Sequence, residues 1–130
     1  MSRYSVAILG ASGLVGQRLQ ELLYNHPFFE VVAIAGSPKH VGLMFEEIEW
    51  RLDSQRPNYD ILICSMSDIP DVDITFSALP SNVAEIVEPS LVARGIHVFS
   101  NASAFRRVAG IPLVIPEINP EAMQAYEGHA

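Results

Sequence analysis

The chain has little of what disulfide, metal or nucleic-acid chemistry requires. It contains one cysteine among 130 residues, so no internal disulfide can form, and no CxxC or Cys/His cluster predicts a structural zinc site. Eight residues are Lys or Arg against 15 Asp or Glu, and the formal net charge of −7 argues against a nucleic-acid groove. We therefore expect no metal, no nucleic-acid partner and a reducing, cytoplasmic setting.

Long apolar runs are also absent. The apolar segment that begins at Tyr4 ends by Ala11, which is too short for a signal peptide or a membrane span, so we expect no membrane association. With 49% hydrophobic residues, the chain is long enough for one well-buried core and too short for two ordinary ones. We therefore interpret residues 1–130 as one domain.

The first third of the chain predicts a strand, a helix and a second strand. Residues 4–9 are apolar and end at Gly10, as is typical of a strand buried on both faces. Residues 30–35 form a second apolar, β-branched run that ends at Gly36. Between them, one helical stripe is formed by Val15, Leu19, Leu22 and Leu23. This βαβ unit predicts a parallel sheet.

The remaining chain continues the alternation. A second helical stripe is closed by Arg94 and Gly95, and Pro89 either kinks it or opens a second short helix; the stripe comprises Val83, Ile86, Val87 and Leu91. Further strands are predicted at residues 60–64, 72–79, 96–99 and 113–115, with a short helix at 45–50 and the start of a helix after Asn119. The prediction is a Rossmann-type, doubly wound α/β fold with a mostly parallel sheet and three layers, α/β/α.

The most informative local pattern is GASGLVG at residues 10–16, between a predicted strand and a predicted helix. Glycine allows a tight turn and a close approach to a pyrophosphate, while the helix N-terminus attracts the anion. The spacing is GxxGxxG, so it matches the usual GxGxxG fingerprint only loosely. An ordinary strand-to-helix turn at Gly10 remains the alternative to a dinucleotide site.

The end of the second predicted strand indicates which dinucleotide such a site would take. An NAD site usually places Asp or Glu there, to hold the ribose 2′-hydroxyl. Residues 36–40 contain no acid, whereas Ser37 can donate a hydrogen bond to a 2′-phosphate and Lys39 can offer it a positive charge. These residues favour NADP over NAD, with a solvated loop as the alternative.

Four segments of the chain form a recognisable series: GASGLVGQ at residues 10–17, VDITFSALPS at 72–81, FSNASAFR at 99–106 and PLVIPEIN at 112–119. Together they resemble the aspartate-semialdehyde dehydrogenase family in its archaeal and fungal branch. They occur in the family's order and extend over nearly the whole chain, so the combination is specific where each motif alone would not be.

The resemblance implies a role for each matching position. The cofactor pyrophosphate would lie against Ser12, Gly13, Leu14 and Val15, and the 2′-phosphate against Ser37 and Lys39. The family often has arginine at the lysine position, and lysine keeps the charge but loses the bidentate fork. The adenosine and nicotinamide channel would be lined by Ser77, Ala78, Leu79 and Pro80.

Asn101 and Arg106 resemble the family's anchors for the phosphate of an acyl-phosphate substrate or for free phosphate. A guanidinium in a polar turn after a strand also suits bidentate phosphate recognition, although a plain surface arginine remains the alternative for Arg106. The implied reaction is the NADPH-dependent reductive dephosphorylation of aspartyl phosphate to aspartate semialdehyde in amino-acid biosynthesis. A cysteine thiolate would displace phosphate, hydride would reduce the thioester, and a histidine would serve as acid and base.

The family's nucleophile follows an asparagine, and no Asn-Cys pair occurs in these 130 residues. Cys64 ends an apolar run and is interpreted as a buried small hydrophobe. None of His26, His40, His97 and His129 matches the family's catalytic histidine. We therefore expect this chain to be an inactive part of a longer, homo-oligomeric enzyme whose second domain carries the nucleophile and the dimer interface.

Two alternatives share the same motifs. A malonyl-CoA reductase of the same branch could carry every segment quoted above, because substrate choice would be decided downstream. A non-catalytic NADP-binding module would explain the missing nucleophile and base. A glycine loop that binds nothing is the least specific possibility.

Overall fold

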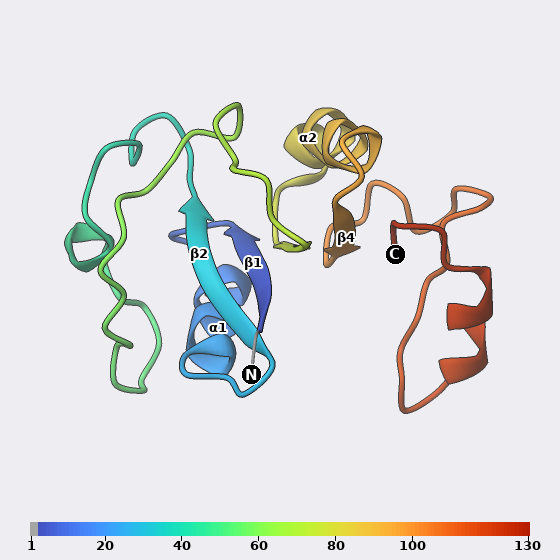
Figure 1. Cartoon of the computed structure of the whole chain (residues 1–130), viewed down its shortest axis with the longest axis horizontal. Coiled ribbons are helices and arrows are strands. Elements are labelled where there is room, and N and C mark those ends of the chain that lie inside the picture. Colours follow the sequence, from blue (N-terminus) through green and yellow to red (C-terminus); the bar gives the residue numbers. More distant parts are fainter. Residues whose placement is uncertain (1–2) are drawn as a thin grey trace.

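The computed structural model describes residues 3–130 and contains a four-stranded parallel sheet (Figure 1). The strands are β1 (Tyr4–Leu9), β2 (Phe29–Ala35), β3 (Ile74–Ser77) and β4 (His97–Ser100). Their order in the sheet is β2-β1-β3-β4, and each neighbouring pair is parallel. The predicted Rossmann-type arrangement is confirmed.

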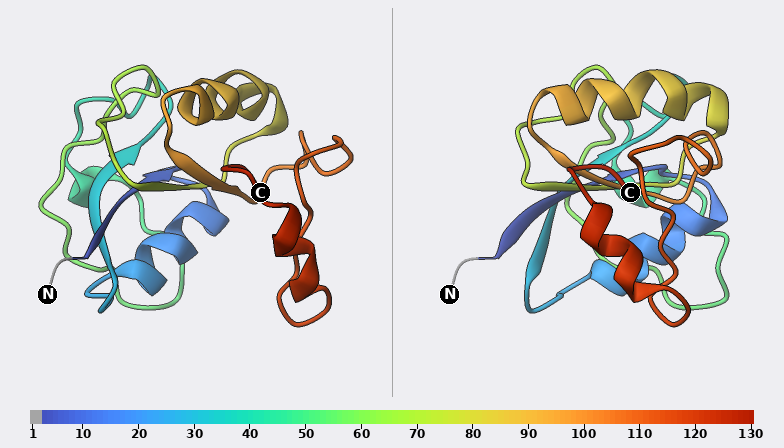
Figure 2. Two further views of the ribbon diagram at one scale, coloured as in Figure 1. Left: turned by 45° about the vertical axis from the view of Figure 1, so that its right-hand side comes forward. Right: turned by 90° about the vertical axis from the view of Figure 1, so that its right-hand side faces the viewer.

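Helices cover both faces of this sheet. Helix α1 (Leu14–Leu23) lies on one face and α2 (Ser81–Ala93) on the other, so the three-layer prediction is confirmed (Figure 2). Two short 3-10 helices, η1 (Phe45–Glu47) and η2 (Pro120–Ala125), complete the elements, and η2 lies on the same side as α1. No helix within residues 3–130 is both long and apolar enough to cross a membrane.

The central strand explains why both faces need cover. Successive side chains of a strand point to opposite faces, and from Val6 to Leu9 both alternating sets of β1 are apolar and fully buried. Val6 and Ile8 belong to the core cluster on the α1 side, whereas Ala7 and Leu9 belong to the cluster on the α2 side. A continuous apolar run therefore produces a buried parallel strand, as predicted.

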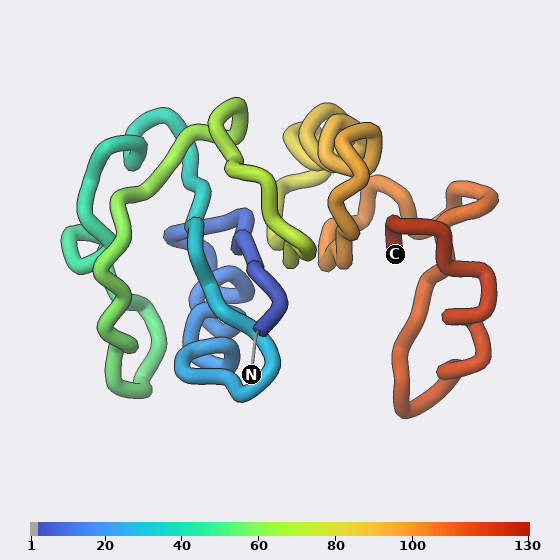
Figure 3. Tube along the Cα trace, viewed as in Figure 1, coloured from blue at the N-terminus to red at the C-terminus, as the bar shows by residue number. Residues whose placement is uncertain are grey.

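The strand predicted at residues 60–64 is wrong. This segment makes two isolated bridges, Cys64 with Ala35 and Leu62 with Met44, and forms no continuous ladder. Cys64 still donates its N–H to the Ile34 oxygen at 3.0 Å, at the outer edge of β2. Figure 3 shows the long irregular segment after β2 winding beside that strand before the chain enters β3. Only Ile63 of this run is buried in the core, and Leu62 is exposed, so the run contributes one core side chain without forming a regular strand.

Other predicted elements differ in extent. Residues 113–115 form no strand, residues 45–50 contain only the single turn η1, and the helix expected after Asn119 is the 3-10 helix η2. The strand predicted at 72–79 shrinks to β3, whose neighbours Asp73 and Ala78 already lie outside it. Pro89 lies inside α2, which is one helix and not two.

The last residues of the chain lie along the free edge of β4. Val98 pairs with His129 in a parallel bridge, and Val98 N donates to the Gly128 oxygen at 2.8 Å. Ala130 N donates to the Val98 oxygen at 2.9 Å. This pairing brings the C-terminal segment to the carboxyl end of the sheet, next to the pocket described below (Figure 1).

Candidate functional site

The sheet order creates a switch point between β1 and β3. The chain leaves β1 toward β2 on one side and later returns to β3 on the other, which opens a crevice beyond the carboxyl ends of these strands. Here Ala78 N donates to the Leu9 oxygen at 2.8 Å, and Asn101 N donates to the Ser77 oxygen at 2.7 Å. The loops that follow β1, β3 and β4 belong to three of the four segments quoted above, and they therefore meet at one edge of the sheet.

The glycine loop is held close to the start of α1. Gly10 has a φ of +123°, a conformation that other residues rarely adopt. A Cβ atom on Gly16 would lie 2.0 Å from the Gly10 carbonyl oxygen, so only glycine fits at the crossing of loop and helix. This contact holds the N-terminus of α1 close to the carboxyl end of β1.

That N-terminus is open to a ligand. Gly13 is the N-cap, no side chain caps the helix, and its first turn contains no acid. Gly13, Leu14 and Val15 are exposed. The first backbone N–H groups of a helix have no partner within it and carry the positive end of its dipole. An anion such as a pyrophosphate fits this arrangement.

Two buried glutamines, which the sequence analysis missed, support the loop. Gln20 Nε2 donates to the Gly10 and Ala11 oxygens at 3.1 and 3.2 Å. Gln17 Nε2 donates to the Glu49 oxygen at 2.7 Å, and Gln17 Oε1 accepts from Arg51 N at 2.8 Å. Because neither glutamine belongs to the apolar stripe of α1, the sequence pattern gave no sign of their burial.

Arg51 is a further residue near the loop that was not predicted. Its Nη1 donates to the Ser12 oxygen at 3.4 Å, which places a guanidinium beside the open end of α1. Arg51 lies in an irregular segment without hydrophobic periodicity, so no sequence signal could have located it there.

The turn after β2 adjoins the same loop. A Cβ atom on Gly36 would lie 3.2 Å from Ala11 Cβ, so the end of β2 packs closely against the glycine loop. Ser37 and Lys39 follow in an exposed turn, with Ser37 Oγ 3.2 Å from His40 Nδ1. The structure thus brings both residues to the edge where the loop lies.

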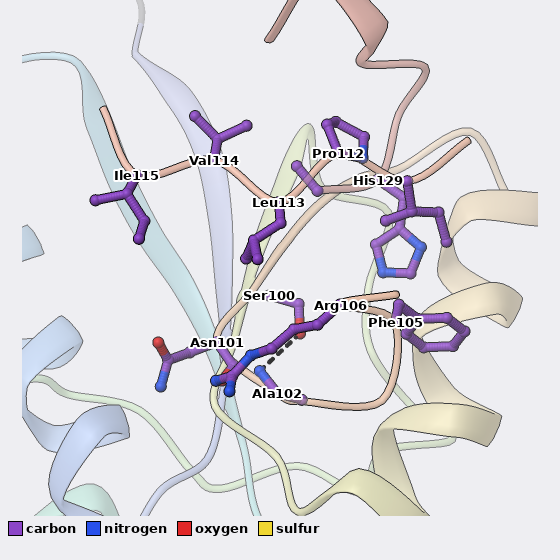
Figure 4. Close-up of a pocket in the computed structure, with 12 residues that line it drawn as sticks. Ser100, Asn101, Ala102, Phe105, Arg106, Pro112, Leu113, Val114, Ile115 and His129 are labelled. Atoms are coloured by element: carbon purple, nitrogen blue, oxygen red, sulfur yellow. Dashed lines mark hydrogen bonds between the residues drawn. The ribbon is translucent and has the colours of Figure 1, made fainter. Parts of the chain in front are cut away.

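Asn101 and Arg106 share a pocket of about 410 Å³ beyond β4. Arg106 Nη2 donates to the Asn101 carbonyl oxygen at 3.3 Å, and both side chains are exposed. Figure 4 shows these two residues and Ser100 on one side of the pocket and residues 112–115 on the other. The pocket combines a cationic group with an amide, a combination suited to an anion.

A second pocket of about 470 Å³ continues from the first toward α1. The two pockets share Ser100, Asn101, Pro112, Leu113, Val114 and Ala130. The second is lined on the sheet side by Phe76 and Phe99 and on the helix side by Val15 and Leu19. A largely apolar hollow with polar groups at one end is the common form of a small-molecule site.

Some side chains do not face the hollow with their reactive groups. The Ser77 hydroxyl is buried and donates to Glu88 Oε2 at 2.7 Å, so it is directed toward α2. Cys64 is half-buried against the core cluster on the α2 side, and burial raises the pKa of its thiol. Within residues 3–130, no group of three or more His, Cys, Asp or Glu could hold a metal ion.

Comparisons with known proteins show the family of the chain. Residues 5–126 match the model of the semialdehyde dehydrogenase NAD-binding domain. Aspartate-semialdehyde dehydrogenase of Archaeoglobus fulgidus is 44% identical over 129 residues, which cover 96% of this chain and 38% of that protein. The enzyme of Methanothermobacter thermautotrophicus is 43% identical over 128 residues, covering 95% of this chain and 37% of the relative.

Structural comparison gives the same result. The crystal structure of aspartate semialdehyde dehydrogenase with NADP from Candida albicans has a TM-score of 0.89 and 35% identity, covering 95% of this chain and 36% of that one. The resemblance to the archaeal and fungal enzymes is thereby confirmed, and the chain spans little more than a third of their length. The chain belongs to the semialdehyde dehydrogenase family, in which it corresponds to the NAD-binding domain.

Proposed function

We propose that this chain binds NADP(H) as the nucleotide-binding domain of an aspartate-semialdehyde dehydrogenase. The observation that carries the proposal is the uncapped N-terminus of α1. It lies close against Gly10 because Gly16 has no side chain at the point of contact. It lies at the switch point of the sheet, where dinucleotides bind in this class of fold. The NADP in the Candida albicans relative supports the choice of ligand.

The roles follow from position. The pyrophosphate would accept hydrogen bonds from the loop and first-turn N–H groups of residues 12–15, and Ser37 and Lys39 would hold the 2′-phosphate. The turn of Ala78, Leu79 and Pro80 would line the channel between the adenosine and nicotinamide halves. Bound NADPH would supply a hydride. The apolar hollow between Val15 and Phe99 has room for a flat ring.

Asn101 and Arg106 would bind the phosphate of the acyl-phosphate substrate, or free phosphate, in the pocket beyond β4. In the whole enzyme, we propose that aspartyl phosphate is reduced to aspartate semialdehyde. The names of the relatives favour this substrate over malonyl-CoA. Because the 130 residues contain no Asn-Cys pair, the nucleophile and its base would come from outside this chain. We propose that the whole enzyme is homo-oligomeric and cytoplasmic.

The test is a calorimetric titration of the purified chain with NADPH and with NADH, repeated for Lys39→Glu. We expect saturable binding that prefers NADPH, and a Lys39→Glu variant that loses affinity for NADPH far more than for NADH, because only NADPH carries the 2′-phosphate. Arg3→Glu is the matched control: it changes the net charge equally at the amino end of β1, where Arg3 pairs with Glu30.

Three outcomes are informative. Preference for NADPH that disappears in Lys39→Glu and persists in Arg3→Glu supports the assignment. Equal losses for both nucleotides in Lys39→Glu would remove the 2′-phosphate role of Lys39. Absence of binding for both nucleotides to the folded chain would contradict the proposed function.

A further inference from the structure

Glu88 is an acid inside the core. Its side chain is fully buried on the inner face of α2, and within residues 3–130 no other Asp or Glu is buried. Ser77 Oγ and Ser100 Oγ donate to its Oε2 atom at 2.7 and 2.6 Å. His129 Nε2 lies 2.7 Å from its Oε1 atom. One carboxylate therefore contacts three separate segments of the chain.

The two serines that contact Glu88 lie next to the candidate site. Ser77 and Ser100 face each other in the last pair of the β3–β4 ladder, immediately before Ala78 and Asn101. Ser100 Oγ also accepts the N–H of Ala102 at 3.0 Å, and Asn101 N donates to the Ser77 oxygen at 2.7 Å. Any displacement of the two serines would be transmitted to the turn after β3 and to the pocket wall after β4.

Stability alone does not explain an acid at this position. Burying a carboxylate is costly, and an apolar residue of similar size in place of a buried ionic group is often neutral or stabilising. The neighbours of Glu88 on the inner face of α2, Ala84 and Leu91, are apolar and fully buried. Hydrogen bonds, in contrast, are directional, so a carboxylate can fix the positions of its partners in a way that an apolar contact cannot.

We propose that Glu88 is a positioning residue of the nucleotide site: its carboxylate fixes the carboxyl ends of β3 and β4, and with them the turn after Ser77 and the pocket wall at Asn101. Through His129 it also holds the C-terminal segment that lines the pocket. The inference rests on the proposed function for its ligand, while the geometry it explains is independent of any ligand.

Three variants separate hydrogen bonding from packing. Glu88→Gln keeps the shape and can keep three contacts with the serine bonds reversed, because its amide N–H groups can donate to both serine oxygens while its oxygen accepts an imidazole N–H. Glu88→Met keeps an unbranched, helix-favouring side chain of similar length but cannot make these bonds. Glu85→Gln, at an exposed position on the same helix, is the control.

The first readout needs no cofactor. Amide hydrogen exchange should rise about tenfold or more at Ala78, Asn101 and Ala102 in Glu88→Met, since a hydrogen bond to a charged group is worth at least this factor. It should stay near the wild-type rate in Glu88→Gln and Glu85→Gln. The Gly10 amide, which donates to the Ala35 oxygen at 2.9 Å, is the internal reference.

The second readout is affinity for NADPH, measured on folded protein. We expect Glu88→Met to weaken NADPH binding about tenfold and Glu88→Gln to restore it. If Glu88→Met does not fold, Ser77→Ala and Ser100→Ala each remove one of the bonds, and the same local rise in exchange is expected. Unchanged exchange at Ala78 and Asn101 in every folded variant, or a uniform rise that includes Gly10, would overturn the inference. If the wild type binds no NADPH, the proposed function fails, and exchange still decides the role of Glu88.

Discussion

At the scale of single residues, Gly16 is the most constrained position in the candidate site. A Cβ atom there would lie 2.0 Å from a backbone oxygen, which cannot rotate away as a side chain could. We expect Gly16→Ala to lower the free energy of unfolding by about 1–3 kcal/mol, the usual cost of overpacking, and to abolish NADPH binding because the loop must move. Urea unfolding and calorimetric titration measure the two effects.

Gly13→Ala is the matched control for this change. Gly13 has a φ of −78°, and a Cβ atom on it would meet no other atom within 4 Å. Its unfolding free energy should stay within about 1 kcal/mol of the wild type, because alanine is a poorer N-cap than glycine but also restricts the unfolded chain. If the two alanine variants unfold alike, the close crossing of loop and helix is wrong.

Cys64 should be a poor nucleophile at neutral pH. Burial raises the pKa of its thiol, and only the thiolate reacts. The thiol proton is therefore held more tightly in the folded chain than in the unfolded chain. The contribution of the protonated thiol to the free energy of unfolding is complete below the ordinary thiol pKa and is lost as pH rises through the pKa of the folded chain. Iodoacetamide should alkylate the native chain more slowly than the urea-unfolded chain near pH 8; equal rates would contradict the burial of the thiol.

Predictability at this scale depends on whether a residue's partners are near in sequence. Gly10 and Lys39 could be chosen as candidates because Gly10 directly follows one predicted strand and Lys39 lies in the turn after the next. Gln20, Arg51 and Glu88 could not, because their environment is set by segments that approach only after folding: Glu88 meets Ser77, Ser100 and His129, 11, 12 and 41 residues away. On a helical pattern, Glu88 resembles any surface acid.

At the scale of elements, α2 contains an internal proline whose removal should stabilise the chain. Pro89 has no N–H to donate to the preceding turn, and it is exposed. We expect Pro89→Ala to raise the free energy of unfolding by about 2 kcal/mol, the helix gain less the extra freedom of the unfolded chain. Thermal and urea unfolding check this value.

The control for the helix proline is Pro120, which lies in the first turn of η2. Proline is compatible with that position because the N–H it lacks would have no helical partner. Pro120→Ala should therefore give no gain in stability. A Pro89→Ala variant that is no more stable than the wild type would mean that the strain of the proline is already relieved elsewhere in α2.

The elements that sequence reasoning identified correctly are those whose pattern is satisfied locally. β1, α1 and β2 follow from an apolar run, a helical stripe and a second run in immediate succession. Residues 60–64 and 113–115 have similar apolar runs, yet one makes isolated bridges at the edge of β2 and the other covers a pocket. An apolar run does not by itself make a strand, because a regular strand also needs a free sheet edge in register, and both runs leave large apolar side chains such as Leu62 and Leu113 exposed.

At the scale of the whole molecule, the candidate site is made of segments spread over the chain. The hollow includes residues from α1, β3, β4 and the segment at 112–116. No local pattern indicates that these segments meet. The resemblance supplied only the order of four motifs along the chain, and the parallel sheet brings the ends of its strands to one edge. The two core clusters, on opposite faces of the same sheet, further make the site dependent on the complete fold.

Because both clusters share β1 and its neighbours, the chain should unfold in one transition that NADPH shifts. Trp50 packs against the α1-side cluster, so its fluorescence reports that layer, while circular dichroism at 222 nm, as an approximate helix signal, reports both helices. At 100 times its Kd, NADPH should add about 2.7 kcal/mol to the unfolding free energy by mass action. NADH at the same concentration is the control and should add less. Separate transitions for the two signals would show that the layers fold independently. Equal shifts from both nucleotides would show that the turn after β2 does not bind the 2′-phosphate.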